Sequence, residues 1–173
     1  ADYEYALHDE HYPDVLAMLA TRAGPWIVLR TFSKAWGLAG LRVGYGMADN
    51  AELVALMDKV RSPFNVNQAA QRAALAAWND PTHMRSGVAA TVALREALRQ
   101  QLTALAAPDQ PLRGLRIAPS VANFLFLDIG RPNGPVTEAL LRQGVIIKPW
   151  KEPGFEHFLR VSIGNDNDNA RFV

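Results

Sequence analysis

The chain has 173 residues, of which 49% are hydrophobic and 20% charged, so it resembles an ordinary globular protein with one good core or two small ones. Its formal net charge of +1 gives no field that would attract nucleic acid or a membrane surface, and no apolar run approaches the roughly 18 residues of a membrane span. The absence of cysteine excludes disulfides and thiolate metal sites, and with no visible signal peptide we expect a cytoplasmic protein.

The first 24 residues are acidic and aromatic at first and then become helical in pattern. A short apolar face at helical spacing predicts a helix here, and it is made by Val15, Leu16 and Leu19. His8 and His11 have the spacing of a metal-ligand pair. No third ligand follows at a suitable distance, and Tyr12-Pro13 interrupts any helix, so we predict no metal site.

A β-rich apolar run at 26–29 and a second run at 42–47 predict two strands. The loop between them is built from small residues and carries Lys34, and Arg42 follows eight positions later. Lys34 alone would suit a solvated turn, or, with Ser33, a Ser-Lys hydrolase. A primary amine also forms an imine with an aldehyde, and a guanidinium grips a phosphate through two parallel hydrogen bonds. Pyridoxal phosphate (PLP) is the cofactor that carries both groups.

The string TFSKAWGLAGLRVGY, residues 31–45, resembles the cofactor-lysine segment of fold-type I PLP-dependent aminotransferases, and most closely that of the histidinol-phosphate aminotransferases. Three further segments share the resemblance: NFLFLDI (123–129), GVIIKPW (144–150) and FLRVSIG (158–164). The resemblance implies that Lys34 is the Schiff-base lysine and that Ser33 and Arg42 are ligands of the cofactor phosphate.

Two helices are predicted after the second strand. Asn50 is expected to cap the first of them. Its predicted buried face is an i, i+3, i+4, i+7 set of apolar residues, namely Leu53, Leu56, Met57 and Val60. Asn67 is expected to cap the second, an alanine-rich helix over 68–78.

A long amphipathic helix is predicted over 82–107. Its charged residues are expected to form the solvated side: Arg85, Arg95, Glu96 and Arg99. Strands are then predicted at 115–118, 123–129, 145–148 and 158–163. A helix over 136–143 is expected to end at Gly144 in the left-handed conformation. Asn165 opens a run of alternating Asn and Asp that resembles the start of a calcium loop but lacks its glycine, so we predict the N-cap of a terminal helix.

Together these elements and the resemblance predict an α/β fold. Residues 1–80 are expected to form the latter part of the large PLP-dependent transferase domain, a mixed sheet with helices, and residues 81–173 a small α+β C-terminal domain. Because the chain opens on alanine rather than methionine, we expect a piece of a longer polypeptide, and the resemblance implies the second half of an aminotransferase. The resemblance places the Asp that pairs with the pyridine nitrogen and the Tyr near the ring hydroxyl in the upstream N-terminal half, so neither Asp2 nor Tyr3 is assigned to these roles.

Arg160 lies in an otherwise apolar predicted strand. An unpaired buried guanidinium is very unfavourable, so Arg160 is expected to have an anionic partner, either an acidic side chain of the protein or a substrate. The resemblance implies the α-carboxylate of the substrate. At Lys148 the resemblance leads us to expect an arginine that helps to hold the substrate phosphate. Lysine keeps the charge but loses the bidentate fork, so Lys148 is either a phosphate ligand or an ordinary charge at a strand end.

The resemblance implies transamination between histidinol phosphate and 2-oxoglutarate, in histidine biosynthesis, by a homodimer that acts on small-molecule amino acids and 2-oxo acids. Lys34 would then move a proton between the substrate Cα and the cofactor. Three alternatives stay open: an aromatic amino acid aminotransferase, a PLP decarboxylase of the same fold, and a cofactor-free regulatory module.

Overall fold

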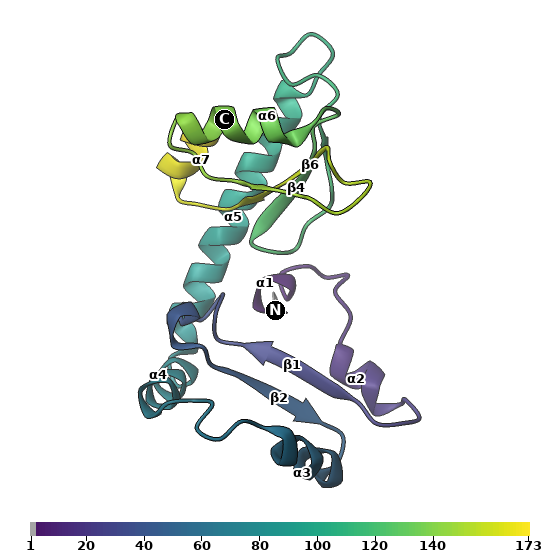
Figure 1. Ribbon diagram of the computed structural model, residues 1–173, viewed down its shortest axis with the longest axis vertical. Helices are drawn as coiled ribbons and strands as arrows, with labels where there is room; N and C mark the ends of the chain where they lie inside the picture. Colours follow the sequence, from purple (N-terminus) through teal and green to yellow (C-terminus); the bar gives the residue numbers. More distant parts are fainter. Residues whose placement is uncertain (1–2) are drawn as a thin grey trace. The chain divides into compact units, whose positions relative to one another are not determined.

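The computed structural model describes residues 3–173, so the prediction about Asp2 lies outside the described residues (Figure 1). The chain divides into two compact units, the first ending at Val88 and the second beginning at Ala89. This division falls inside helix α5 (Pro81–Leu105), and the domain boundary between residues 80 and 81 stays a prediction. Within the described part of the chain, no helix is both long and apolar enough to cross a membrane.

The first unit contains the two predicted strands, which pair antiparallel from Ile27 opposite Ala48 to Thr31 opposite Gly44 (Figure 1). The sequence pattern predicts no helix at α1, because four residues are too few to show a helical period. The elements of this unit before α5 are α1 (Tyr3–Ala6), α2 (Val15–Ala20), β1 (Ile27–Thr31), the 3₁₀ helix η1 (Ala39–Leu41), β2 (Gly44–Ala48), α3 (Ala51–Val60) and α4 (Gln68–Trp78).

Both predicted helix caps in this unit are confirmed. The Asn50 side chain accepts a hydrogen bond from the backbone N–H of Leu53 at 2.8 Å, and Asn67 caps α4 in the same way. The predicted burial of α3 is wrong, since Val60 is 84% exposed and Leu56 and Met57 also face solvent. Periodicity shows that a helix has an apolar face, but it does not show what packs on that face, and no described residue buries it.

The core of the first unit joins α4 to the segment between the strands. Ala70 and Ala74 lie one turn apart on α4 and are buried against Phe32 and Val43. Two small residues at this spacing let the helix approach the strand ends closely. The segment between β1 and β2 therefore rests on a helix.

The second unit is an antiparallel sheet of order β3-β4-β6-β5 with helices packed on it. Its elements after α5 are β3 (Arg116–Ile117), β4 (Phe124–Asp128), α6 (Asn133–Arg142), β5 (Lys148–Pro149), β6 (Phe158–Ser162) and α7 (Asp166–Phe172). The α6 helix begins three residues earlier than predicted, and the side chain of its first residue, Asn133, donates hydrogen bonds to the carbonyls of Trp150 and Phe158, both at 2.8 Å. Gly144 has the predicted left-handed conformation, with φ of 77°. Asn165 caps α7 in a capping box, as predicted.

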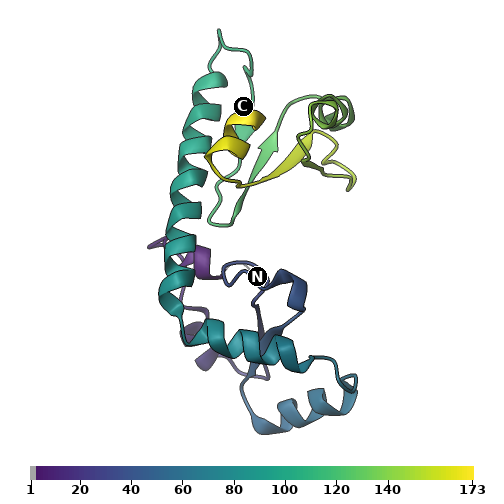
Figure 2. The ribbon, with the colours of Figure 1, turned by 90° about the vertical axis from the view of Figure 1, so that its left-hand side faces the viewer.

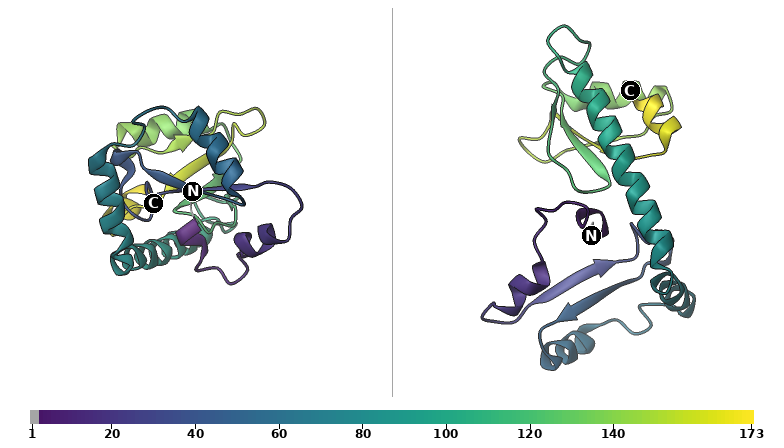
Figure 3. Two further views of the ribbon diagram at one scale, coloured as in Figure 1. Left: turned by 90° about the horizontal axis from the view of Figure 1, so that it is seen from below. Right: turned by 180° about the vertical axis from the view of Figure 1, so that it is seen from behind.

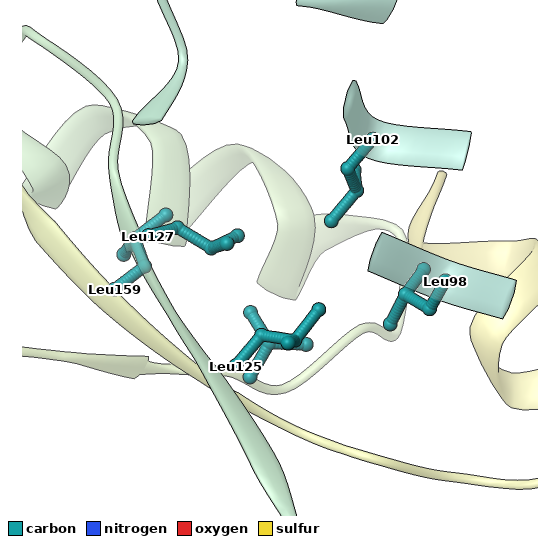
Figure 4. Packing of buried hydrophobic residues seen from close by; sticks show 6 residues of the cluster. Leu98, Leu102, Leu125, Leu127 and Leu159 are labelled. Atoms are coloured by element: carbon teal, nitrogen blue, oxygen red, sulfur yellow. The ribbon is translucent and has the colours of Figure 1, made fainter. Parts of the chain in front are cut away.

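Leucines from α5 and from the two central strands form the core of this unit (Figure 4). The cluster consists of Leu98 and Leu102 from α5, Leu125 and Leu127 from β4, and Leu159 and Val161 from β6. Seen from behind, α5 crosses in front of β4 (Figure 3), and α7 lies beside α5 (Figure 2). Because side chains alternate along a strand, the residues between these leucines belong to the opposite face of the sheet. That face carries Phe124, Phe126, Phe158 and Arg160.

The prediction that Arg95 lies on the solvated side of α5 is wrong, because the residue is only 6% exposed. Positions 95, 98 and 102 share one helix face, so Arg95 lies beside the two core leucines of α5. Its guanidinium donates to the carbonyl of Ala122 at 2.9 Å and to Glu96 at 3.1 Å. Burial works to raise the pKa of Glu96, but hydrogen bonds from Arg99 and Arg95 hold that pKa below its ordinary value.

Because of Asp128, we expect the folded protein to lose stability in acid. The backbone N–H of Gly130 donates to its carboxylate at 2.9 Å, and with the Arg116 guanidinium this lowers the pKa of Asp128 despite burial. Since the unfolded carboxyl binds its proton at a higher pH than the folded one, protonation favours unfolding as the pH falls below about 4. Urea unfolding midpoints measured from pH 3 to 7 are expected to fall at the acid end. In Asp128→Asn this fall should be smaller, and an equal fall in the variant would show that Asp128 does not contribute.

Candidate active site

Lys34 lies in the connection between β1 and β2, which backbone hydrogen bonds close into a compact loop. The N–H of Phe32 donates to the carbonyl of Val43 at 3.1 Å, so the two ends of the connection meet. The N–H of Leu38 returns to Phe32, and the N–H of Gly37 donates to the carbonyl of Lys34, both at 2.9 Å. Gly37 has φ of 73°, a conformation that favours glycine. The backbone of Lys34 is therefore held on both sides while its side chain is exposed.

Arg42 has an unusual backbone conformation at the end of this connection. Its φ of 55° and ψ of 47° are left-handed, which costs a non-glycine residue roughly 1–2 kcal/mol. The guanidinium donates from Nη1 to the carbonyl of Ala39 at 2.7 Å and is otherwise exposed. Bulky residues held in this region are most common at functional sites, where the surrounding structure maintains them.

Ser33 lies directly before Lys34 and is half-buried. Its N–H donates to the hydroxyl of Thr31 at 3.0 Å, which fixes the start of the turn. Within residues 3–173, neither the Ser33 hydroxyl nor the Lys34 amine makes a hydrogen bond or ion pair. One short connection thus offers an uncommitted amine, an uncommitted hydroxyl and a guanidinium. This set of groups fits the aldehyde and the phosphate of PLP.

Arg160 and Lys148 are directly opposite each other in the second unit, as register partners on β6 and β5. Two like charges at such a pair repel, so the arrangement is unfavourable without an anion. The Arg160 guanidinium lies over the ring of Phe124, 5.0 Å from its centroid, and the Lys148 ammonium lies 5.1 Å from the ring of Trp150. The buried Nε of Arg160 has no hydrogen-bond partner, and no described acid forms an ion pair with either residue. The alternative of an internal salt bridge for Arg160 therefore has no partner among residues 3–173.

The sheet face around these two cations is aromatic. The rings of Phe126 and Phe158 stack with centroids 4.9 Å apart, and Trp150 meets Phe126 edge-on at 5.3 Å. Apolar rings beside a charge exclude water and strengthen its attraction for an anion. The face can therefore hold an anionic group more tightly than an isolated surface arginine would.

One feature of the lysine connection, a contact between Trp36 and Glu4, is not predicted from the sequence. Glu4 of α1 is only 7% exposed, and its Oε1 accepts a hydrogen bond from the indole Nε1 of Trp36 at 3.0 Å. Trp36 also belongs to an aromatic cluster with Phe32, Tyr45 and Trp78. Burial in this cluster raises the pKa of Tyr45. A contact across 32 residues leaves no local pattern in the sequence, although the neighbouring aromatic residues are visible there.

Known proteins match nearly the whole chain. The family described as aminotransferase class I and II matches residues 4–173. Histidinol-phosphate aminotransferase 3 of Rhizobium meliloti is 46% identical over 98% of this chain, and histidinol-phosphate aminotransferase 1 of Mesorhizobium japonicum is 49% identical over 98%. The chain spans 44% of the length of each of these two relatives.

Solved structures agree with this fold. The histidinol-phosphate aminotransferase of Sinorhizobium meliloti, in complex with pyridoxal-5'-phosphate, is 28% identical with a TM-score of 0.69 over 84% of this chain and 38% of that one. The histidinol-phosphate aminotransferase of Clostridium acetobutylicum has a TM-score of 0.82 over 99% of this chain and 50% of that one, a likeness of fold at 20% identity. The predicted α/β fold and the resemblance of the chain to aminotransferases are thus confirmed, and the chain belongs to the class I and II aminotransferase family.

Proposed function

We propose that the full-length protein is a PLP-dependent aminotransferase that transfers an amino group between histidinol phosphate and 2-oxoglutarate. The observation that carries this proposal is the closed connection between β1 and β2, in which Lys34 has an uncommitted amine beside Ser33 and Arg42. The names of the relatives support the choice of substrate, since the two quoted above are 46% and 49% identical to this chain.

Each residue of the connection has a role in this proposal. When bound, PLP supplies an aldehyde carbon that links to amines and a ring that withdraws electrons from that link. Lys34 would hold the cofactor through Nζ, and Ser33 and Arg42 would hold its phosphate by hydrogen bonds and charge. The Lys34 amine would also move a proton between the substrate Cα and the cofactor. Its exposed position leaves this amine accessible to a substrate.

Arg160 and Lys148 would bind the anionic ends of the two substrates. Histidinol phosphate carries a phosphate, whereas 2-oxoglutarate carries carboxylates. Arg160 suits either group because its fork donates two parallel hydrogen bonds, and its buried Nε has no other partner among the described residues. Lys148 lies opposite Arg160 and adds a second positive charge at the same point of the sheet. A doubly charged phosphate gains more from that second charge than a carboxylate does, which favours a phosphorylated substrate.

The assembly and the compartment also belong to this proposal. The whole protein is proposed to act as a homodimer in the cytoplasm, with the upstream half contributing the remaining groups around the cofactor ring. The exposed apolar residues of α3 and of the segment after it support a covered surface in the complete protein, since Val60 is 84% and Phe64 99% exposed.

A comparison of substrates tests the proposal. Purified full-length protein is supplied with 2-oxoglutarate and either histidinol phosphate, phenylalanine or tyrosine, and glutamate formation is measured together with carbon dioxide release. We expect the highest kcat/KM with histidinol phosphate. Faster turnover of the aromatic amino acids, or release of carbon dioxide in place of glutamate, would show that one of the alternative enzymes is the correct one. No turnover and no bound cofactor would favour the regulatory module.

Substitution of Lys148 tests whether the substrate carries a phosphate. We expect Lys148→Met to raise KM for histidinol phosphate roughly tenfold, because a charge-assisted contact to the phosphate is lost. KM for phenylalanine should change much less, since its carboxylate needs only one cation. Lys59→Met, at an exposed lysine of α3, is the matched control. Equal changes for both substrates would identify Lys148 as an ordinary charge at a strand end.

A further inference from the structure

Glu4 and Trp36 form a partly buried contact that the transfer reaction, as proposed above, does not use. The carboxylate of Glu4 accepts the indole N–H of Trp36 at 3.0 Å, and Trp36 lies two residues after Lys34. We propose that Glu4 and Trp36 are positioning residues that hold the Lys34 turn in the geometry needed to bind the cofactor. This inference rests on the proposed role of Lys34.

The geometry connects Trp36 to Lys34 through a short and closed piece of backbone. The N–H of Gly37, directly after Trp36, donates to the carbonyl of Lys34 at 2.9 Å. A rotation or shift of the indole therefore moves the turn that carries the lysine. An error of about 1 Å in the placement of a reacting group is enough to reduce its effectiveness strongly.

The Trp36 ring is held by contacts of two kinds. It packs against Phe32, with centroids 5.5 Å apart, and it stacks on Trp78 at 5.7 Å. Stacking fixes the plane of a ring but leaves it free to slide within that plane. The hydrogen bond to Glu4 is directional and fixes the remaining freedom.

Glu4 is itself anchored, so it can act as a fixed point. It belongs to α1, where the adjacent Tyr3 ring lies under the guanidinium of Arg30, with its centroid 3.0 Å from the guanidinium carbon. Arg30 is a residue of β1, so this contact ties α1 to the strand. A buried carboxylate is unfavourable unless it is hydrogen-bonded, and no described residue forms an ion pair with Glu4. The carboxylate therefore depends on the indole as much as the indole depends on it.

A purely structural contact would behave differently from a positioning contact. If the bond only stabilised the fold, its loss would lower the unfolding temperature and leave the affinity of the folded protein for PLP unchanged. A positioning role lowers that affinity in protein that is still folded. Trp78 is the matched control, because it stacks on the other residues of the cluster and has no hydrogen bond to Glu4.

The experiment measures attachment of PLP to Lys34 in the full-length protein. Unloaded protein is titrated with PLP, the product is fixed with borohydride, and the modified peptide is quantified by mass spectrometry, while thermal unfolding is recorded on the same unloaded samples. Trp36→Phe keeps an aromatic ring but removes the donor, and Glu4→Met removes the acceptor. Each should raise the half-saturating PLP concentration about tenfold, the effect of losing one hydrogen bond to a charged group. The double variant should be no worse than either single variant, because both remove the same bond.

Two further variants separate the explanations. Glu4→Gln keeps an acceptor for the indole and should restore most of the affinity. Trp78→Phe keeps an aromatic ring against Trp36 and leaves the hydrogen bond to Glu4 in place, so it should lower the unfolding temperature with a much smaller change in the half-saturating concentration than Trp36→Phe. If Trp36→Phe and Trp78→Phe changed both quantities in the same proportion, or if Glu4→Met left the half-saturating concentration unchanged, the positioning role would be overturned while Lys34 remained the attachment site. If the wild-type protein were not modified at Lys34 at all, the proposed function would be overturned, and the positioning role with it.

Discussion

Replacing Lys34 with alanine is expected to abolish attachment of PLP to the chain and to reduce transamination by roughly a thousandfold or more. The amine has two roles in the proposed reaction, attachment of the cofactor and transfer of the Cα proton, so both are lost together. Because Lys34 is exposed and makes no hydrogen bond or ion pair within residues 3–173, the substitution should leave the stability of the unloaded protein nearly unchanged.

Two controls make the Lys34 result specific. Lys34→Arg keeps the positive charge but cannot form the covalent link or act as a base near neutral pH, so it should be as inactive as the alanine variant. Lys59→Ala changes another exposed lysine of the same unit and should retain full activity. The measurements are the initial rate of glutamate formation and the mass of the borohydride-treated peptide. Full activity in Lys34→Ala would contradict both the cofactor assignment and the proposed function.

Local chemistry explains why several elements were predictable from the sequence. Asn50, Asn67 and Asn165 each cap a helix as predicted, because a capping side chain needs only the backbone N–H groups two or three residues ahead of it. The left-handed Gly144 is similar, since the requirement belongs to one residue. Such features depend only on residues that are close to one another in the sequence.

The two wrong predictions concern which helix faces are buried against other parts of the protein. Arg95 was expected in solvent because arginine usually lies there, yet it shares a helix face with Leu98 and hydrogen-bonds the carbonyl of Ala122. The apolar face of α3, which includes Val60, was expected in a core that the described residues do not provide. For α3 the helical period was correct, and the missing information was which part of the protein packs on its apolar face. For Arg95 the period itself places the residue beside Leu98 and Leu102, and the error was to follow residue type instead.

In the candidate site too, the sequence identifies the residues but not how the fold places them. The motif identifies Lys34 and Arg42 by residue type and spacing, but not the left-handed backbone that holds Arg42. Sequence marks Arg160 as a cation in an apolar strand, but only the register of β5 and β6 places Lys148 directly opposite. Their pairing turns two separate charges into one anion-binding position, and this is a property of the sheet that neither strand shows alone.

Arg160 should be the second most sensitive position, and it should respond in opposite directions in two assays. Its guanidinium is proposed to bind substrate carboxylate, so Arg160→Met is expected to lower kcat/KM for 2-oxoglutarate roughly 10²- to 10³-fold, mainly through KM. Arg160→Lys keeps the charge but loses the fork and should lose about tenfold. Arg142→Met, at an exposed arginine of α6 that pairs with Glu138, should behave as wild type in the enzyme assay.

In contrast to its effect on kcat/KM, the Arg160→Met substitution should not lower the stability of the unliganded protein. In the unliganded protein the buried Arg160 Nε lacks a partner within the described residues, and Lys148 opposite it adds repulsion. Replacing this half-buried, unpaired side chain with an apolar one removes the unsatisfied Nε and the repulsion from Lys148, so the urea midpoint of Arg160→Met should stay level or rise. A site kept for its ligand shows this combination, because the charge is unfavourable until the substrate arrives. A clear loss of stability with an unchanged KM would instead mean that Arg160 serves the fold through a partner beyond residues 3–173.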